Sequence, residues 1–225
     1  MELNHRHDWN VDATAAVALQ KELAAEIIAD RPLDVESVRL VAGVDVSVKD
    51  DESGTAQSQA AVVVLSYPEL KVVETQLAKM PTPFPYIPGL LAFREGPVLV
   101  TAFEQLEHTP DVFIFDGMGR AHPRRIGIAS MMGLWLQKPT IGCGKTRLVG
   151  KHADLPEEKG SAVDLVDKHE VIGQVVRTRT NVKPVYISPG HLIDLPSAVD
   201  FTMHCLTRYR LPEPIRAAHN AAGSF

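Results

Sequence analysis

Three acidic residues stand where a charge is costly unless it is paired or bound to a metal ion. Asp45 lies between two valines in a segment of alternating apolar residues, so it points to the opposite face of a strand from them. Asp116 follows an apolar run at 112–115, and Glu95 lies in a segment with helical spacing. Ligands of α/β proteins gather at the carboxyl ends of strands. Together these carboxylates could share one divalent ion, the pattern expected of Mg²⁺ acting on phosphate esters.

Each carboxylate also has a structural explanation when it is taken alone. Asp45 could be a core acid satisfied by hydrogen bonds, and Asp116 could be a turn former beside Gly117. Glu95 could be the ion-pair partner of its neighbour Arg94. It is the combination of two strand acids with one helix acid that indicates a site.

Lys145 is the cation best placed for phosphate chemistry. It follows the apolar segment Thr140–Cys143 and a glycine, and its ammonium could meet a phosphate there as a point charge. An ordinary surface lysine is the alternative. The letters Gly-Cys-Gly-Lys-Thr at 142–146 also invite comparison with a nucleotide-binding loop, but Pro139 stands where that loop requires a glycine. The sequence therefore does not predict an ATPase or a kinase.

Two histidines also stand near predicted strand ends. His122 follows Asp116 by a short loop, and His191 follows a Ser-Pro-Gly turn. Either imidazole could position water or a phosphate, although a lone histidine is more often a packed or surface residue. No zinc-like spacing occurs among the nine histidines. Cys143 is expected to be a small core residue.

Length and composition favour a single domain over residues 1–225. The chain is 45% hydrophobic and 23% charged, without repeats or low-complexity tracts. The two cysteines could form at most one bridge, which excludes a disulfide scaffold and a four-cysteine zinc site. No apolar run approaches the roughly 18 residues that span a bilayer. We therefore expect a cytoplasmic protein without a membrane segment.

Charge is segregated along the chain. The net charge is −5, yet residues 117–153 contain seven basic residues and no acid, which leaves 16 bases and 28 acids, or −12, for the remainder. A local positive stripe can neutralise phosphates whatever the net charge is. A solvated basic face is the alternative. The members of this basic stripe are Arg120, Arg124, Arg125, Lys138, Lys145, Arg147 and Lys151.

Hydrophobic periodicity predicts an α/β fold in which three antiparallel strands come first. Strands are predicted at 38–48, 60–67, 71–79, 111–115, 140–143 and 185–188, with a mixed stretch at 171–177. Helices are predicted at 13–29, 90–106, 126–136 and 197–209, the second with a break near its Gly-Pro pair. Between the third strand and the second helix, residues 80–89 contain four prolines and form a stiff loop.

Several long motifs in the same order resemble the endonuclease V family, which comprises deoxyinosine-directed repair nucleases with a fold similar to ribonuclease H. The motifs are Val41-Ala42-Gly43-Val44-Asp45-Val46, Pro85-Tyr86-Ile87-Pro88-Gly89, Phe93-Arg94-Glu95, Asp116-Gly117 with Gly119, His122-Pro123-Arg124-Arg125, Gly127-Ile128-Ala129-Ser130, Lys138-Pro139-Thr140-Ile141-Gly142, Lys145, Gly190-His191 and Arg210-Leu211-Pro212-Glu213-Pro214. The resemblance covers most of the chain. It implies a ribonuclease H-like mixed sheet, flanked by helices.

The resemblance also implies an activity and a set of residues. It makes Asp45, Glu95 and Asp116 the site of a Mg²⁺ ion that Mn²⁺ can replace, with His191 close by and Lys145 beside the reacting phosphate. The implied reaction hydrolyses the second phosphodiester on the 3′ side of an inosine and leaves 3′-hydroxyl and 5′-phosphate ends. Inosine-containing DNA is the expected substrate, single-stranded RNA stays open, and a monomer is expected.

Substrate recognition is implied for two groups of residues. The loop Pro85-Tyr86-Ile87-Pro88 resembles the family's strand-separating wedge, which offsets the cost of unstacking when a base is everted. Backbone groups at the glycine-containing loops would hold the everted base and read its O6 atom, where adenine presents an amino group. The residues at these positions are Gly89, Leu91, Gly117, Gly127 and Ile128, and His122 is a further expected substrate-binding residue.

Two departures from the family pattern lie near this site. Met118 replaces a polar residue, and Cys143-Gly144 replaces the usual Val-Ala before Lys145. These departures leave open a nucleic-acid-binding module that does not cleave. Another ribonuclease H-like phosphodiesterase, such as a junction or RNA nuclease, is a further alternative.

Overall fold

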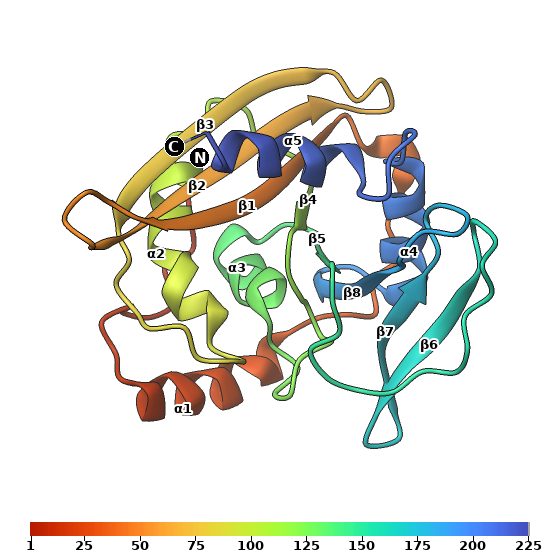
Figure 1. Cartoon of the computed structure of the whole chain (residues 1–225), viewed down its shortest axis with the longest axis horizontal. Helices are drawn as coiled ribbons and strands as arrows, with labels where there is room; N and C mark the ends of the chain where they lie inside the picture. The colour runs from red at the N-terminus through yellow and green to blue at the C-terminus, as the bar shows by residue number, and fades with distance from the viewer. Residues whose placement is uncertain (225) are drawn as a thin grey trace.

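One eight-stranded mixed sheet runs through the protein in the computed structural model, which describes residues 1–224. In chain order the strands are β1 (Leu40–Asp50), β2 (Ala56–Ser66), β3 (Val72–Pro81), β4 (Val112–Phe115), β5 (Thr140–Gly144), β6 (Ala162–Asp167), β7 (Glu170–Val176) and β8 (Val185–His191). Their spatial order is β3-β2-β1-β4-β5-β8-β7-β6 (Figure 1). β1 to β3 are antiparallel neighbours, β4 and β5 run parallel to β1, and β6 to β8 pair antiparallel. The α/β, ribonuclease H-like mixed sheet with three antiparallel strands first is therefore confirmed.

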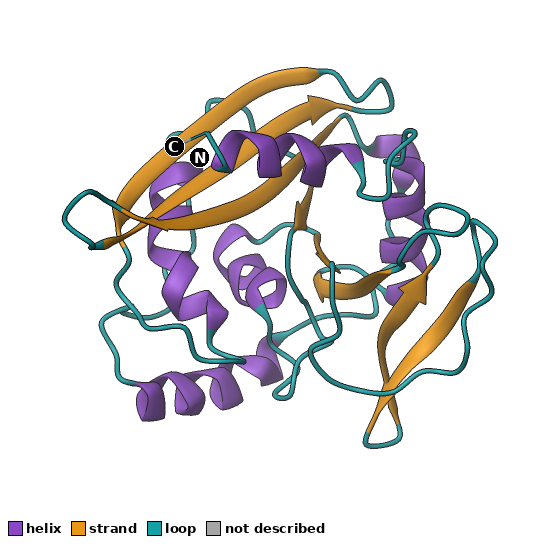
Figure 2. Cartoon of the chain, viewed as in Figure 1, coloured by secondary structure: helices purple, strands orange, loops and turns teal. Residues whose placement is uncertain are grey.

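Helices cover both faces of this sheet (Figure 2). They are α1 (Ala13–Leu23), α2 (Leu91–Glu104), α3 (Ile128–Leu136), α4 (Leu195–His204) and α5 (Glu213–Ala222), with single 3-10 turns at Ala24–Glu26 and Val35–Ser37. Alternate residues of β1 enter different cores, because side chains alternate across a strand. Ala42 and Val44 pack with α1, α2 and α3, whereas Val41 packs with α4 and α5. Within residues 1–224, no helix is both long and apolar enough to cross a membrane.

Several element boundaries differ from those expected. The predicted break in the second helix does not occur, since α2 continues through Pro97. Burial of Phe93, Val98 and Leu99 on that helix offsets the one backbone hydrogen bond that a proline removes. The helix expected at 13–29 ends at Leu23. The helix expected to reach residue 209 ends at His204.

Two elements are additional to the predicted set. The stretch at 171–177 is the second strand of a hairpin, β6 and β7, and its first strand was not predicted. Helix α5 follows the Arg-Leu-Pro-Glu-Pro motif and packs on β1. Both cysteines are buried free thiols, and burial raises the pKa of Cys143 to about 12. That thiol is therefore a core group, as expected.

Candidate active site

Asp45 and Asp116 lie on neighbouring parallel strands. Val44 pairs with Phe115, and the Asp116 amide donates to the Val44 carbonyl at 2.9 Å, so the ladder places the two aspartates next to each other. Each sits one residue beyond a side chain that enters the α2 and α3 core, so each points to the opposite face. β4 ends before Asp116, which leaves this carboxylate at the carboxyl end of a strand. The juxtaposition expected from the sequence is thus present in the structure.

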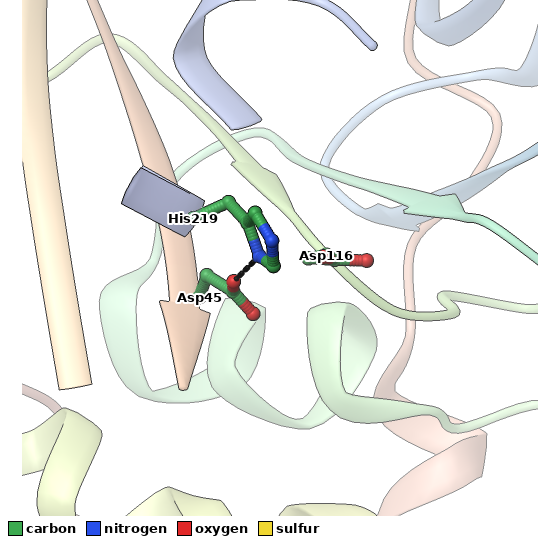
Figure 3. A group of neighbouring side chains, drawn as sticks. All are labelled: Asp45, Asp116 and His219. Atoms are coloured by element: carbon green, nitrogen blue, oxygen red, sulfur yellow. Dashed lines mark hydrogen bonds and ion pairs between the residues drawn. The ribbon is translucent and has the colours of Figure 1, made fainter. Parts of the chain in front are cut away.

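Helix α5 adds a histidine to this pair of carboxylates. His219 Nδ1 lies 2.7 Å from an oxygen of Asp45, and one ligand atom from each of His219, Asp45 and Asp116 falls within 4.8 Å of the others (Figure 3). The helix is seated by close backbone contact, since a Cβ on Gly43 would lie only 1.8 Å from the Pro214 carbonyl oxygen. At its other end the Gln59 side-chain amide donates to the Ala222 carbonyl at 3.2 Å.

Sequence reasoning missed His219 because helix α5 was not predicted. A signal was present: Ile215, Ala218 and Ala222 are buried at helical spacing after a proline pair, and His219 lies on the adjoining face. What the sequence could not supply is the packing of this helix on β1, which is a contact between segments more than 160 residues apart.

Glu95 reaches the same place from α2, on the other side of the sheet. Burial raises its pKa well above the usual range, and the charges of Asp45 and Asp116 raise it further. The pKa of Asp45 is also raised, first by burial and then by Asp116, while the hydrogen bond from His219 opposes this shift. The fold therefore holds three carboxylates close enough to repel one another, which is costly unless a cation joins them.

Lys145 supplies the positive charge at the centre of this cluster. It directly follows β5, its ammonium donates to an Asp116 oxygen, and the same nitrogen lies 3.5 Å from His219 Nδ1. Carboxylate oxygens with one imidazole form a donor set that suits a hard or borderline divalent cation. The arrangement fits a metal ion held beside a lysine that can face a phosphate.

A cavity of about 400 Å³ adjoins these groups, a size typical of small-molecule sites. Its walls include Asp116 and Lys145, so it opens directly onto the charged cluster. All but one of the residues expected to bind substrate line it, the exception being Pro85. The lining residues from that set are Tyr86, Ile87, Pro88, Gly89, Leu91, Gly117, His122, Gly127 and Ile128. Tyr86 lines this cavity and is 70% exposed.

The two predicted histidines have structural partners. His122 Nε2 lies 2.9 Å from the Gly89 carbonyl oxygen, and the Arg124 amide donates to His122 Nδ1 at 3.1 Å. Both ring nitrogens are therefore used within the protein. His191 is buried outside the cluster, where its Nδ1 accepts a hydrogen bond from the Ile28 amide at 3.2 Å. It pairs with Thr140 at the start of β5, whereas Lys145 follows the end of that strand.

The basic stripe is largely paired with the protein itself. Arg125 binds Glu170 at 2.6 Å and Asp167 at 2.9 Å, both in the β6–β7 hairpin, and Arg120 also binds Glu170. Arg124 donates to a side chain of α1 and to a backbone carbonyl, and Lys145 is bound to Asp116 as described above. Within residues 1–224, three members of the stripe form no ion pair and remain for an external phosphate: Lys138, Arg147 and Lys151.

Met118 and Gly144, which both depart from the family pattern, lie against each other. A Cβ on Gly144 would lie 2.4 Å from Met118 Cε and 2.9 Å from its sulfur. Both residues line the cavity, and Met118 is buried. The methionine side chain thus occupies the space that an alanine methyl group at position 144 would need. The two changes are sterically coupled, so they count as one alteration of the cavity wall.

Comparison with known proteins identifies many similar chains. A family model described as Endonuclease V matches residues 21–220. The endonuclease V of Nostoc punctiforme is 47% identical over 224 residues and covers 100% of both chains. The crystal structure of endonuclease V from Bacillus subtilis superposes with a TM-score of 0.94 at 32% identity, over 99% of this chain and 95% of that one. A Ciona intestinalis endonuclease V in complex with a 24mer DNA containing an inosine followed by a ribo-adenosine gives a TM-score of 0.79 at 31% identity, over 94% and 97% of the two chains.

Proposed function

The chain belongs to the endonuclease V family and is a nuclease; we propose that it is a Mg²⁺-dependent endonuclease that recognises inosine in DNA. In this proposal it hydrolyses the second phosphodiester bond on the 3′ side of the lesion and leaves 3′-hydroxyl and 5′-phosphate ends. The observation that carries the proposal is the cluster of Asp45, Asp116 and His219 beside a cavity that Asp116 lines, with Glu95 near enough for the charges of both aspartates to act on it. The groups that bind the base and the groups that cleave the phosphodiester would then lie next to each other.

Asp45, Glu95, Asp116 and His219 would hold the metal ion, with Mg²⁺ favoured by the carboxylate oxygens and Mn²⁺ able to substitute. When bound, such an ion supplies Lewis-acid activation of water and neutralises charge on the phosphate. His219 holds the Asp45 carboxylate in place through its Nδ1 atom. The His219 side chain is 56% exposed, so it is the close packing of α5 on β1 that keeps the imidazole beside Asp45.

Lys145 would stabilise the negative charge that develops on the phosphate. Its ammonium lies in the cavity wall beside Asp116 and is about one-third exposed, so phosphate oxygens can reach it. A fixed cation aimed at the reacting group is worth more than one in water, because it needs no reorganisation during the reaction. In the free protein the same ammonium partly offsets the repulsion among the acids.

The cavity would read the everted hypoxanthine through backbone groups. The first turn of α2 begins in its wall at Leu91, and its amides at Leu91 and Ala92 have no acceptor within the helix. Such donors suit the O6 acceptor of hypoxanthine and oppose the amino group of adenine. Tyr86 and Ile87 would occupy the gap that eversion leaves in the base stack. The inosine-containing DNA bound by the Ciona intestinalis protein supports this assignment.

Cleavage mapping tests the proposal directly. Matched DNA and RNA strands that carry one inosine are incubated with Mg²⁺, with Mn²⁺ or with a chelator, and the products are sized against markers. We expect metal-dependent cutting at the second phosphodiester 3′ to inosine in DNA, with single-stranded RNA as a further substrate. Binding without any cut in either metal would instead support a module that does not cleave. We also expect a monomer that acts in the cytoplasm, which sedimentation and cell fractionation check.

A further inference from the structure

Gln20 of helix α1 lies in the cavity wall but belongs to neither the carboxylate cluster nor the wedge. Its side chain is only 1% exposed. A buried amide is costly unless its donors and acceptor are satisfied, so such a residue is retained in a core only where its partners are fixed. The partners of Gln20 therefore indicate what it does.

These partners belong to two different segments of the chain, each of which contributes residues to the cavity wall. The Gln20 amide nitrogen donates to the Gly89 carbonyl at 3.0 Å and to the Ile126 carbonyl at 3.5 Å. Its side-chain oxygen accepts from Arg124 Nε at 2.6 Å. Gly89 directly follows the wedge, whereas Arg124 and Ile126 belong to the loop that carries Gly127. The Gln20 side chain thus links the end of the wedge segment, at Gly89, to the loop that contains Arg124 and Ile126.

The Gly89 carbonyl is the point at which these ties converge. Besides Gln20, it receives Arg124 Nη2 at 2.8 Å and His122 Nε2 at 2.9 Å. The pKa of His122 is lowered to about 4 by burial, so the ring is neutral. Since Nδ1 accepts from a backbone amide, the proton must lie on Nε2 and is donated to Gly89. Three donors on one carbonyl oxygen fix the direction in which it points.

The peptide unit that follows Gly89 is held by hydrogen bonds at both its carbonyl and its amide. Gly89 has φ +82°, and the Leu90 amide donates to the Ile87 carbonyl at 2.9 Å, which closes a tight turn just before α2. Because glycine has no Cβ, rotation of this peptide unit is opposed by the turn bond of Leu90 together with the three donors on the carbonyl. A carbonyl that turned into the cavity would present an acceptor to the base, and an acceptor suits the amino group of adenine. The donors at the start of α2 suit hypoxanthine only while this carbonyl is held away.

We propose that Gln20 is a positioning residue for base selectivity, which keeps the Gly89 carbonyl out of the cavity and so excludes adenine. The inference rests on the proposed function, because it assigns a residue to the discrimination step of that site. Gln20 touches neither the metal ligands nor Lys145 in the described structure. Its loss should therefore change which base is accepted more than how fast a correctly placed phosphate is cut.

The test compares inosine with adenine in otherwise identical strands. Gln20→Leu removes donor and acceptor at similar volume, and Gln20→Glu keeps the acceptor for Arg124 but loses the donor to Gly89. Leu23→Ala is the matched control, since it weakens the packing of the same helix without touching the network. Single-turnover rates and dissociation constants are measured for each strand, together with the melting temperature of every variant.

We expect both Gln20 variants to lose about ten-fold in the inosine-to-adenine ratio, mainly through binding, with the rate on bound inosine changed less. Leu23→Ala should lower the melting temperature and leave the ratio unchanged. An unchanged inosine-to-adenine ratio in Gln20→Glu, or an equal fall of that ratio in Leu23→Ala, would overturn the inference. The proposed function would still stand in that case if the wild-type protein cleaves the inosine strand. A wild-type protein without preference for inosine would overturn both.

Discussion

Replacing Asp45 by asparagine should have opposite effects on the metal-free and metal-loaded protein. One oxygen of Asp45 lies within 4.8 Å of an oxygen of Asp116, so at an effective dielectric constant of about 20 their gross repulsion is roughly 3 kcal/mol. Lys145 and His219 offset part of it. We expect the metal-free Asp45→Asn variant to be about 1 kcal/mol more stable than wild type, which is about 2 °C in melting temperature for a chain of 225 residues.

Magnesium should reverse this order. At a Mg²⁺ concentration of about 100 times the dissociation constant, wild type gains about 2.7 kcal/mol, or about 6 °C, and Asp45→Asn should gain little. Protons compete with the ion because the pKa of Glu95 and of Asp45 is raised. These raised values stabilise the metal-free fold at low pH, and this contribution is lost as pH rises through them, so the Mg²⁺-induced shift should shrink as pH falls.

Thermal denaturation with and without Mg²⁺ measures both effects without relying on cleavage. Asp164→Asn is the matched control, since Asp164 is an exposed acid on the edge strand β6 and should leave the Mg²⁺-induced shift intact. A full shift retained by Asp45→Asn would refute the metal assignment. A metal-free Asp45→Asn protein that melts many degrees below wild type would refute the repulsion argument.

Three further measurements test other parts of the site. The pKa of His122 is about 4 in the folded protein against 6.5 in the unfolded chain, so the contribution of the neutral ring to the free energy of unfolding should be fully present above pH 6.5. About 3 kcal/mol should be lost as the pH falls through 4. Denaturant titration should find this loss in wild type and not in His122→Gln. In binding titrations at several salt concentrations, Arg147→Ala should reduce the slope of log K against log salt by about 0.9 for duplex DNA. Arg125→Ala should leave the slope unchanged, because the Arg125 guanidinium is already paired with Asp167 and Glu170. Gly144→Ala should destabilise the wild-type background and be tolerated in Met118→Ala, with a coupling energy of about 1–3 kcal/mol in a double-mutant cycle read by melting.

Features that depend on local periodicity could be predicted from the sequence. The alternation of β1 placed Asp45 on the face opposite its valine neighbours, and the short apolar run before Asp116 placed that acid at a strand end. Both inferences need only the two-residue repeat of a strand and the position of strand termini. The adjacency of the two acids then follows from the parallel pairing of β1 with β4.

Features that depend on contacts between distant segments could not be predicted in this way. The basic stripe was interpreted from charge along the chain, but the acids that pair with Arg120 and Arg125 come from a hairpin about 45 residues later. Strand β6 of this hairpin was not predicted because only Leu165 of its six residues is buried, so the segment lacks the apolar alternation of an inner strand. Gln20 gave no signal at all, since its partners are two backbone carbonyls and one arginine.

The position of the carboxylates on the sheet explains how the fold can hold like charges together. β1 is paired on both sides, by β2 along its whole length and by β4 up to Val44, so Asp45 cannot move away from Asp116 without breaking a ladder. Glu95 is fixed independently by α2, whose buried residues pack beneath the same strands. The repulsion, roughly 3 kcal/mol for one charge pair, is therefore opposed by two separate restraints: the ladders on both sides of β1 and the hydrophobic packing of α2. A site built on one loop would relax instead, and would order its acids only when the cation arrived.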